Sequence, residues 1–138
     1  MGNYGFAQDC PMKDGIMEIH HNSIFQLDHP TNDVTIYSVN KEVNSISDGT
    51  VLSIIDLPGS SKEILIKQCV IGEEDKYYVY YNIESTTLQK GYFIETGELI
   101  GHANLNNDRF EFDFQYRTKN EKLYPQKILN CKIANIYH

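Results

Sequence analysis

Histidine and aspartate side chains in this chain have the chemistry needed to bind a zinc ion. His29 and Asp33 bracket the segment HPTND, and Asp113 follows Glu111 in a later segment. Imidazole nitrogens and carboxylate oxygens are common zinc ligands, and a zinc-bound water can act as the nucleophile of a hydrolase. His29, Asp33 and Asp113 are therefore candidate metal ligands. Glu111 is a candidate to hold the water.

The same residues also have an interpretation without a metal. His29 and Asp33 could cap a loop, and Glu111 and Asp113 could form the solvated face of a strand. The range 110–116 alternates aromatic and polar residues, which places the two kinds on opposite faces of a strand. We expect the core face to consist of Phe110, Phe112, Phe114 and Tyr116. The polar face then consists of Glu111, Asp113 and Gln115.

Strand signals dominate the rest of the chain. Runs rich in β-branched and aromatic residues alternate with turn residues such as those at 58–61, where we expect a hairpin turn. A short helical turn is expected only at 124–129, where Pro125 lies near the start. The pattern predicts one all-β domain built as a curved antiparallel sheet or sandwich. The expected strands are 51–55, 63–70, 77–83 and 110–116.

Composition restricts the class of partner. The chain has 138 residues, which is typical of one domain, and a formal net charge of -7 that opposes binding to phosphate backbones. No apolar run approaches the roughly 18 residues needed to cross a bilayer. The N-terminus lacks the basic start and apolar stretch of a complete signal peptide. We therefore expect no nucleic acid partner and no membrane insertion.

The three cysteines leave two possibilities open. Cys10, Cys69 and Cys131 contain no C-x-x-C pair, which argues against a thiolate zinc site. Chain termini often lie close together, so Cys10 and Cys131 could form a disulfide in an oxidising compartment. The alternative is three inert thiols, with Cys69 buried at the end of an apolar run.

Several segments, read in order, resemble the lysostaphin-type (LytM-type) zinc endopeptidases, which are peptidoglycan hydrolases with a duplicated-hybrid-motif β fold. The range 43–51 resembles the family's V-x-A-x-x-D-G-x-V turn and strand, and 89–101 resembles its V-K-V-G-Q-x-V-K-K-G-Q-x-I-G segment. Pro125 with Ile128 and Leu129 resembles the terminal D-P-x-x-Y-L. The resemblance implies an N-terminal segment (1–28) that packs on the domain, a β domain (29–130) and a C-terminal tail (131–138).

The resemblance also implies that most catalytic histidines are missing. The histidine of the family's Y-x-H-L motif corresponds to Asn82, whose amide cannot accept a proton at neutral pH. The two histidines of H-L-H-F-E-I-R correspond to Glu111 and Asp113, and a further one corresponds to Gln68. His29 and Asp33 keep the spacing of the first ligand pair, H-x-G-x-D, with Thr31 in place of the glycine.

This pattern predicts a catalytically inactive relative with a binding, regulatory or scaffold role at the bacterial cell envelope, outside the cytoplasm. Its groove, formed by Asn82, His102, Glu111 and Asp113, would bind a protein, peptide or glycan, and no cofactor is expected. His102 is placed in a loop. The alternative is a residual zinc peptidase that uses His29, Asp33 and Asp113. A carrier or sugar-phosphotransfer domain of similar architecture is a third possibility, for which no residue is suitably placed.

The tyrosine-rich strand 77–83 offers a further contact surface. Tyr77, Tyr78, Tyr80 and Tyr81 alternate across the strand, so two should lie in the core and two should be exposed. The exposed pair, together with Tyr92, could stack on sugars or on a partner protein, and packing alone would also account for them.

Overall fold

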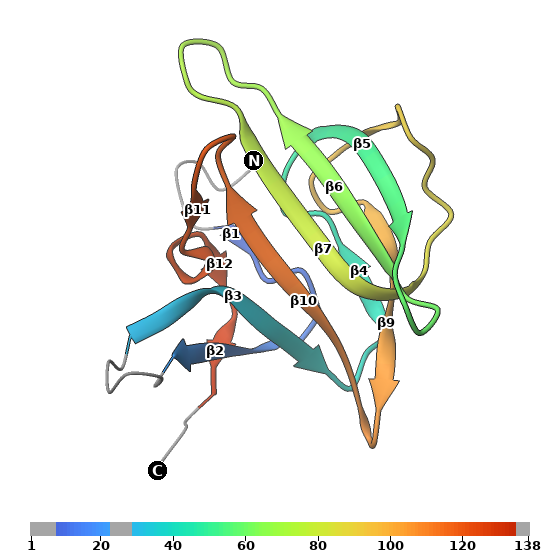
Figure 1. Cartoon of the computed structure of the whole chain (residues 1–138). Coiled ribbons are helices and arrows are strands. Elements are labelled where there is room, and N and C mark those ends of the chain that lie inside the picture. Colours follow the sequence, from blue (N-terminus) through green and yellow to red (C-terminus); the bar gives the residue numbers. More distant parts are fainter. Residues whose placement is uncertain (1–7, 23–28, 135–138) are drawn as a thin grey trace.

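The structure, a computed structural model, describes residues 8–22 and 29–134, and within these the side chains of 8, 21, 22 and 29–32 are not described. Eleven strands form one open sheet (Figure 1), confirming the all-β prediction. Its main path has the order β13-β2-β3-β10-β9-β7-β6-β5-β8; β10 also pairs with β7, β11 joins β10, and β4 joins β9. These strands are β2 (Ile16–Asn22), β3 (His29–Ser38), β4 (Glu42–Asn44), β5 (Gly49–Asp56), β6 (Lys62–Gln68), β7 (Lys76–Ser85), β8 (Phe93–Ile94), β9 (Leu99–Asn106), β10 (Arg109–Arg117), β11 (Lys122–Leu123) and β13 (Lys132–Ile133).

The pairings between the long central strands are antiparallel, as predicted, and parallel pairs join segments from the two ends of the chain. β13 pairs in parallel with β2, and the separate pair β1 (Gln8–Asp9) and β12 (Leu129–Asn130) is also parallel. The only helix in the described residues is the 3-10 turn η2 (Pro125–Lys127), which lies within the predicted range 124–129. No described segment forms a helix long and apolar enough to cross a membrane.

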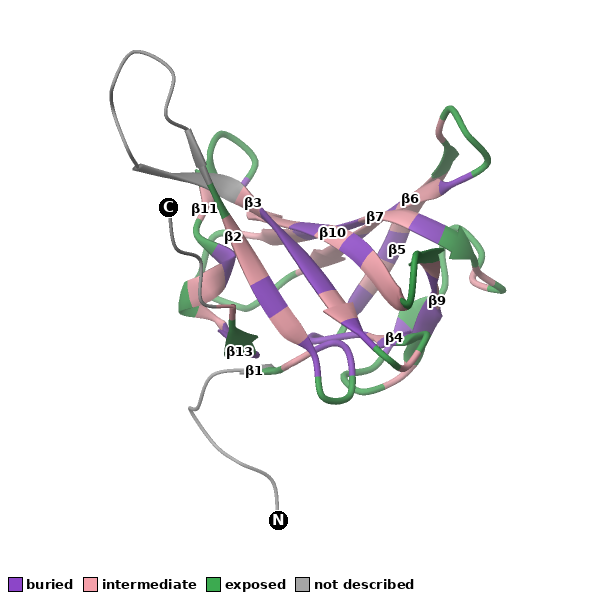
Figure 2. Cartoon of the chain, turned by 90° about the horizontal axis from the view of Figure 1, so that it is seen from below, coloured by how far each residue is buried: buried purple, intermediate pink, exposed green. Residues whose placement is uncertain are grey.

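The core lies on one face of the central strands. Buried and partly buried residues alternate along the middle of β10 (Figure 2), as expected for a strand with one face packed. In β10, Phe112 and Phe114 are buried, while Asp113 and its polar neighbours on the other face are partly exposed. The Tyr80 ring meets Phe114 edge to face, with ring centroids 5.1 Å apart. This confirms the predicted faces of 110–116.

A close approach between β7 and β9 requires a glycine at position 101. A Cβ atom there would lie 2.3 Å from the Ser85 carbonyl oxygen and 3.1 Å from the Ile83 side chain. Both contacts are closer than side chains tolerate, so an alanine would push the two strands apart. Gly101 ends the segment 89–101 that carries the sequence resemblance, and its role here is steric.

The two ends of the chain are joined by a disulfide between Cys10 and Cys131. Of the two possibilities for the cysteines, the structure therefore has the disulfide between Cys10 and Cys131. The prediction that Cys69 is buried is wrong, because β6 ends at Gln68 and Cys69 begins the exposed connection to β7. The predicted turn at 58–61 is confirmed as the connection between β5 and β6, where Gly59 adopts a φ of 84°.

Candidate functional site

Polar side chains gather on the face of β3, β7 and β10 opposite the core. In the strand register, Asp113 on β10 is paired with Thr35 on β3 and with Tyr81 on β7. Two residues further along β10, Gln115 is paired with Asp33 on β3. Residues two apart on a strand share a face, so this register brings both aspartates to one polar surface.

The Asp113 carboxylate is held by two neutral donors. The Thr35 hydroxyl donates a hydrogen bond to Oδ1 at 2.5 Å, and the Asn82 side-chain amide donates to Oδ2. Thr35 is buried, and its hydroxyl also lies 2.7 Å from Nε2 of His20 on β2. Both carboxylate oxygens of Asp113 therefore already accept hydrogen bonds from the protein.

Asn82 is placed by an unusual backbone conformation. Its φ is +61°, in the left-handed region that asparagine adopts more readily than most residues. The Asn104 side chain donates to the Asn82 carbonyl oxygen at 2.6 Å, and the Ser61 hydroxyl donates to Asn82 Oδ1 at 3.4 Å. These contacts fix the amide so that its NH2 group meets Asp113.

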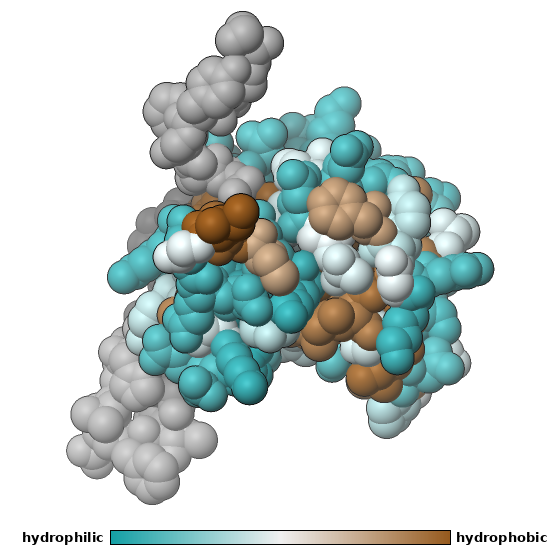
Figure 3. Space-filling view, turned by 90° about the horizontal axis from the view of Figure 1, so that it is seen from above, coloured by the Kyte–Doolittle hydropathy of each residue, from teal (hydrophilic) through white to brown (hydrophobic). Residues whose placement is uncertain are grey.

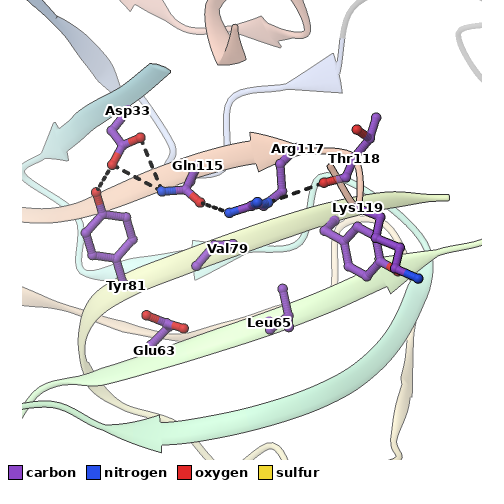
Figure 4. A pocket seen from close by; sticks show the side chains of 10 residues that line it. Asp33, Glu63, Leu65, Val79, Tyr81, Gln115, Arg117, Thr118 and Lys119 are labelled. Atoms are coloured by element: carbon purple, nitrogen blue, oxygen red, sulfur yellow. Dashed lines mark hydrogen bonds between the residues drawn. The ribbon is translucent and has the colours of Figure 1, made fainter. Parts of the chain in front are cut away.

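The Asp33 carboxylate is engaged in the same way. The Tyr81 hydroxyl donates to Oδ2 at 2.6 Å, and the Gln115 amide lies 3.2 Å from each carboxylate oxygen (Figure 4). The Lys122 ammonium on β11 lies 3.5 Å from Oδ1. Burial, together with the hydrogen bond to Asp33, raises the pKa of Tyr81 well above its ordinary value, so the phenol stays a donor.

The described residues do not fit a zinc ion. A zinc site groups three or four nitrogen, sulfur or oxygen ligands around one ion, whereas the neighbours of the two carboxylates here are the neutral hydrogen-bond donors Thr35, Asn82, Tyr81 and Gln115. Within the described part of the chain, no three His, Cys, Asp or Glu residues are grouped as metal ligands. The third predicted ligand, His29, begins β3, and its side chain lies outside the described residues.

Three other predicted site residues have contacts of their own, apart from those of Asp33 and Asp113. Glu111 accepts a hydrogen bond from Arg109 Nε at 3.0 Å, and Gln68, at the end of β6, accepts one from the Tyr78 hydroxyl at 2.7 Å. His102 was expected in a loop, and this is wrong: it pairs with Glu42 and Ser85 within β9. Of the predicted site residues, Asn82 is therefore hydrogen-bonded to Asp113, whereas Gln68 is hydrogen-bonded to Tyr78.

A pocket of about 590 Å³ opens beside Asp33 on the same face. Leu65 and Val79 form its apolar floor (Figure 4). Tyr77 and Tyr81 line it and are half-buried, which corrects the expectation that the outward-facing pair is exposed. Both tyrosines lie on a central strand, with paired residues of β6 on one side and of β10 on the other. The other pair, Tyr78 and Tyr80, lies in the core as predicted. Tyr92 is exposed.

Sequence reasoning missed several residues of this surface. Thr35 shares the odd-numbered register of β3 with Asp33, and Arg117 continues the polar face of β10 beyond Gln115. Extending the alternation of 110–116 by one residue would have found Arg117. The partner strands could not be assigned from one sequence, so the contacts of Asp33 and Asp113 were not predictable.

Comparison with solved structures finds several proteins with a similar architecture, among them zinc peptidases of the lysostaphin type. Csd3 of Helicobacter pylori aligns with a TM-score of 0.64 and 18% identity, over 97% of this chain and 38% of that chain. A zinc-containing peptidase of Vibrio cholerae aligns with a TM-score of 0.58 and 16% identity, over 77% of this chain and 32% of that one. The catalytic domain of lysostaphin from Staphylococcus simulans aligns with a TM-score of 0.52 and 12% identity, over 89% and 88% of the two chains.

This chain has the fold of the lysostaphin-type zinc peptidases. No protein-family model matches its sequence, and no curated protein does. The chain spans only about a third of the length of the Vibrio cholerae peptidase and of Csd3. The lysostaphin-type fold is therefore shared at low sequence identity, and fold alone does not determine activity.

Proposed function

We propose that this lysostaphin-type domain is a binding module that does not cleave its ligand. The observation that carries the proposal is the hydrogen bond from the Asn82 amide to Asp113. Sequence resemblance places a catalytic histidine of the family at position 82 and a zinc-binding histidine at position 113. An amide nitrogen that donates to a carboxylate can neither take a proton from water nor bind a metal in place of an imidazole.

The remaining surface favours binding. The pocket beside Asp33 keeps an apolar floor, tyrosine rings and charged groups at its edges, which are features of sites that hold small ligands or peptide segments. The Cys10–Cys131 disulfide is typical of proteins from oxidising compartments and supports a location outside the cytoplasm. We therefore infer a role at the bacterial envelope, with peptidoglycan fragments or an envelope protein as ligand.

A residual zinc peptidase is the second candidate. His29 and Asp33 keep the spacing of a ligand pair, and Asp113 lies on the neighbouring strand. This function would require a zinc ion to be held by His29 and by two carboxylates that also accept hydrogen bonds from Asn82 and Tyr81. Glu111 would have to act as proton acceptor, although its carboxylate pairs with Arg109.

Co-sedimentation with purified peptidoglycan separates the two candidates. We expect the full chain to sediment with the wall material and to release no soluble fragments, with or without added zinc. Arg117→Glu should weaken sedimentation severalfold, because it reverses the charge at the pocket edge. Glu74→Lys, on the exposed β6–β7 connection, serves as the charge-changed control and should have no effect. Fragment release that disappears in Asp113→Asn would contradict a binding module.

A further inference from the structure

The pocket beside Asp33 has groups of opposite charge at its two ends. Glu63 and Tyr81 lie at one end, and Arg117 and Lys119 lie at the other (Figure 4). Val79 lies between them on the floor. The strand register places these residues in two rows across the sheet. Glu63 is paired with Tyr81 in one row, and Arg117 is paired with Tyr77 in the other. A ligand that matches this surface carries a cation and an anion at opposite ends.

The charges at the two ends are available to a ligand. Among ion pairs between described residues, none includes Glu63, Arg117 or Lys119. Arg117 donates only to neutral oxygens there, those of the Gln115 side chain and the Thr118 carbonyl, each at 3.3 Å. Asp33, by contrast, already lies near the Lys122 ammonium. The Glu63 carboxylate is therefore the acidic group that can accept a ligand's cation.

The length of the pocket fits a short extended peptide. Tyr81 and Tyr77 mark the two rows and are four residues apart on β7, which is about 13 Å at roughly 3.3 Å per residue. An extended peptide of roughly three to four residues spans the same distance. The Leu65 and Val79 side chains would contact small apolar side chains of such a peptide.

We propose that this pocket binds a short peptide through its two free ends, with the terminal carboxylate at Arg117 and Lys119 and the terminal ammonium at Glu63. The inference rests on the proposed binding function and specifies its ligand. A guanidinium suits carboxylate recognition because it offers paired N–H donors. A peptide joined at one end to a larger molecule keeps one of the two charged contacts, so it should bind more weakly than a released peptide and still bind.

Calorimetric titration of the full chain with tetra-alanine tests the proposal. We expect the peptide with both ends free to bind, and N-acetylation or C-amidation to weaken binding about tenfold each, because each removes a charge-assisted contact. Glu63→Gln should weaken the free peptide about tenfold and make the protein indifferent to acetylation, while amidation still weakens binding. Arg117→Gln should show the reverse pattern. Glu74→Gln, outside the pocket, should behave as the unmodified chain.

Two results would overturn the proposal. One is equal binding of the doubly capped and the free peptide. The other is no binding of the free peptide at millimolar concentration. Either result, combined with retained sedimentation on peptidoglycan and no cleavage, would remove the free-end ligand and leave the binding module intact. Cleavage of the peptide would instead contradict the binding module itself.

Discussion

Replacing Cys10 and Cys131 with serine lowers the free energy of unfolding by about 4 to 5 kcal/mol, by the loop-entropy relation for a long closed loop. The disulfide joins positions separated by 121 residues, so the unfolded chain loses much conformational freedom when it is closed. It also holds β1 against β12 and lies next to the parallel pair of β2 and β13. Denaturant unfolding of the oxidised chain and of the double variant measures the difference.

The remaining cysteine provides the control. Cys69 is exposed and unbridged, so Cys69→Ser should leave the unfolding midpoint unchanged. Adding reductant to the unmodified chain should reproduce the loss seen in the double variant. A double variant as stable as the oxidised chain would show that the sheet alone holds the two ends together.

Unfolding should become easier above pH 10, because buried tyrosines resist ionisation in the folded chain. Burial raises the pKa of Tyr80 from 10.0 to about 12, and it also raises the pKa values of Tyr78 and Tyr81. Below pH 10 these phenols are protonated in both states, so their contribution is complete. Above pH 10 the unfolded tyrosines ionise first, which favours the unfolded state until the folded pKa is reached.

For Tyr80 alone this linkage amounts to about 1.4 kcal/mol per pH unit, or roughly 3 kcal/mol between its two pKa values. Denaturant unfolding at a series of pH values measures the slope. Tyr80→Phe should reduce the slope of the unfolding free energy against pH by about 1.4 kcal/mol per pH unit. The variant also loses the hydrogen bond that the Tyr80 hydroxyl accepts from the Ile46 amide, but this lowers stability equally at every pH. Parallel curves for the two chains would contradict buried-tyrosine linkage.

The sequence predicted those features that depend on local pattern. Alternation in 110–116 placed Phe112 and Phe114 in the core and Asp113 on the polar face, because side chains in a strand change face at each residue. Turn residues at 58–61 placed the β5–β6 connection. The family resemblance led to the correct fold, although no family model matches the chain.

Features that depend on contacts between distant strands could not be predicted. The Asp33–Tyr81 and Asp113–Asn82 hydrogen bonds join β3, β7 and β10, and a single sequence does not specify which strands are neighbours. His102 was assigned to a loop because Gly101 precedes it, yet that glycine permits the close packing of β9 against β7. Cys69 is exposed because β6 ends one residue before it, and the sequence pattern did not specify that end.

Apolar side chains are also exposed on the molecular surface. On the face shown in Figure 3, apolar side chains form small separate clusters among hydrophilic ones. Small clusters of this kind are normal on a protein surface and do not by themselves indicate a docking site. Charged and aromatic groups in the pocket beside Asp33 therefore remain the stronger basis for ligand recognition.

Zinc content after loading and desalting shows whether this domain holds a metal centre. The full chain should be incubated with excess zinc, desalted and analysed for metal, alongside His29→Ala, Asp33→Asn and Asp113→Asn. Because both described carboxylates are held by protein donors, we expect far less than one equivalent of zinc in every sample. Near one equivalent in the unmodified chain, lost in all three variants, would contradict a binding module without a metal centre.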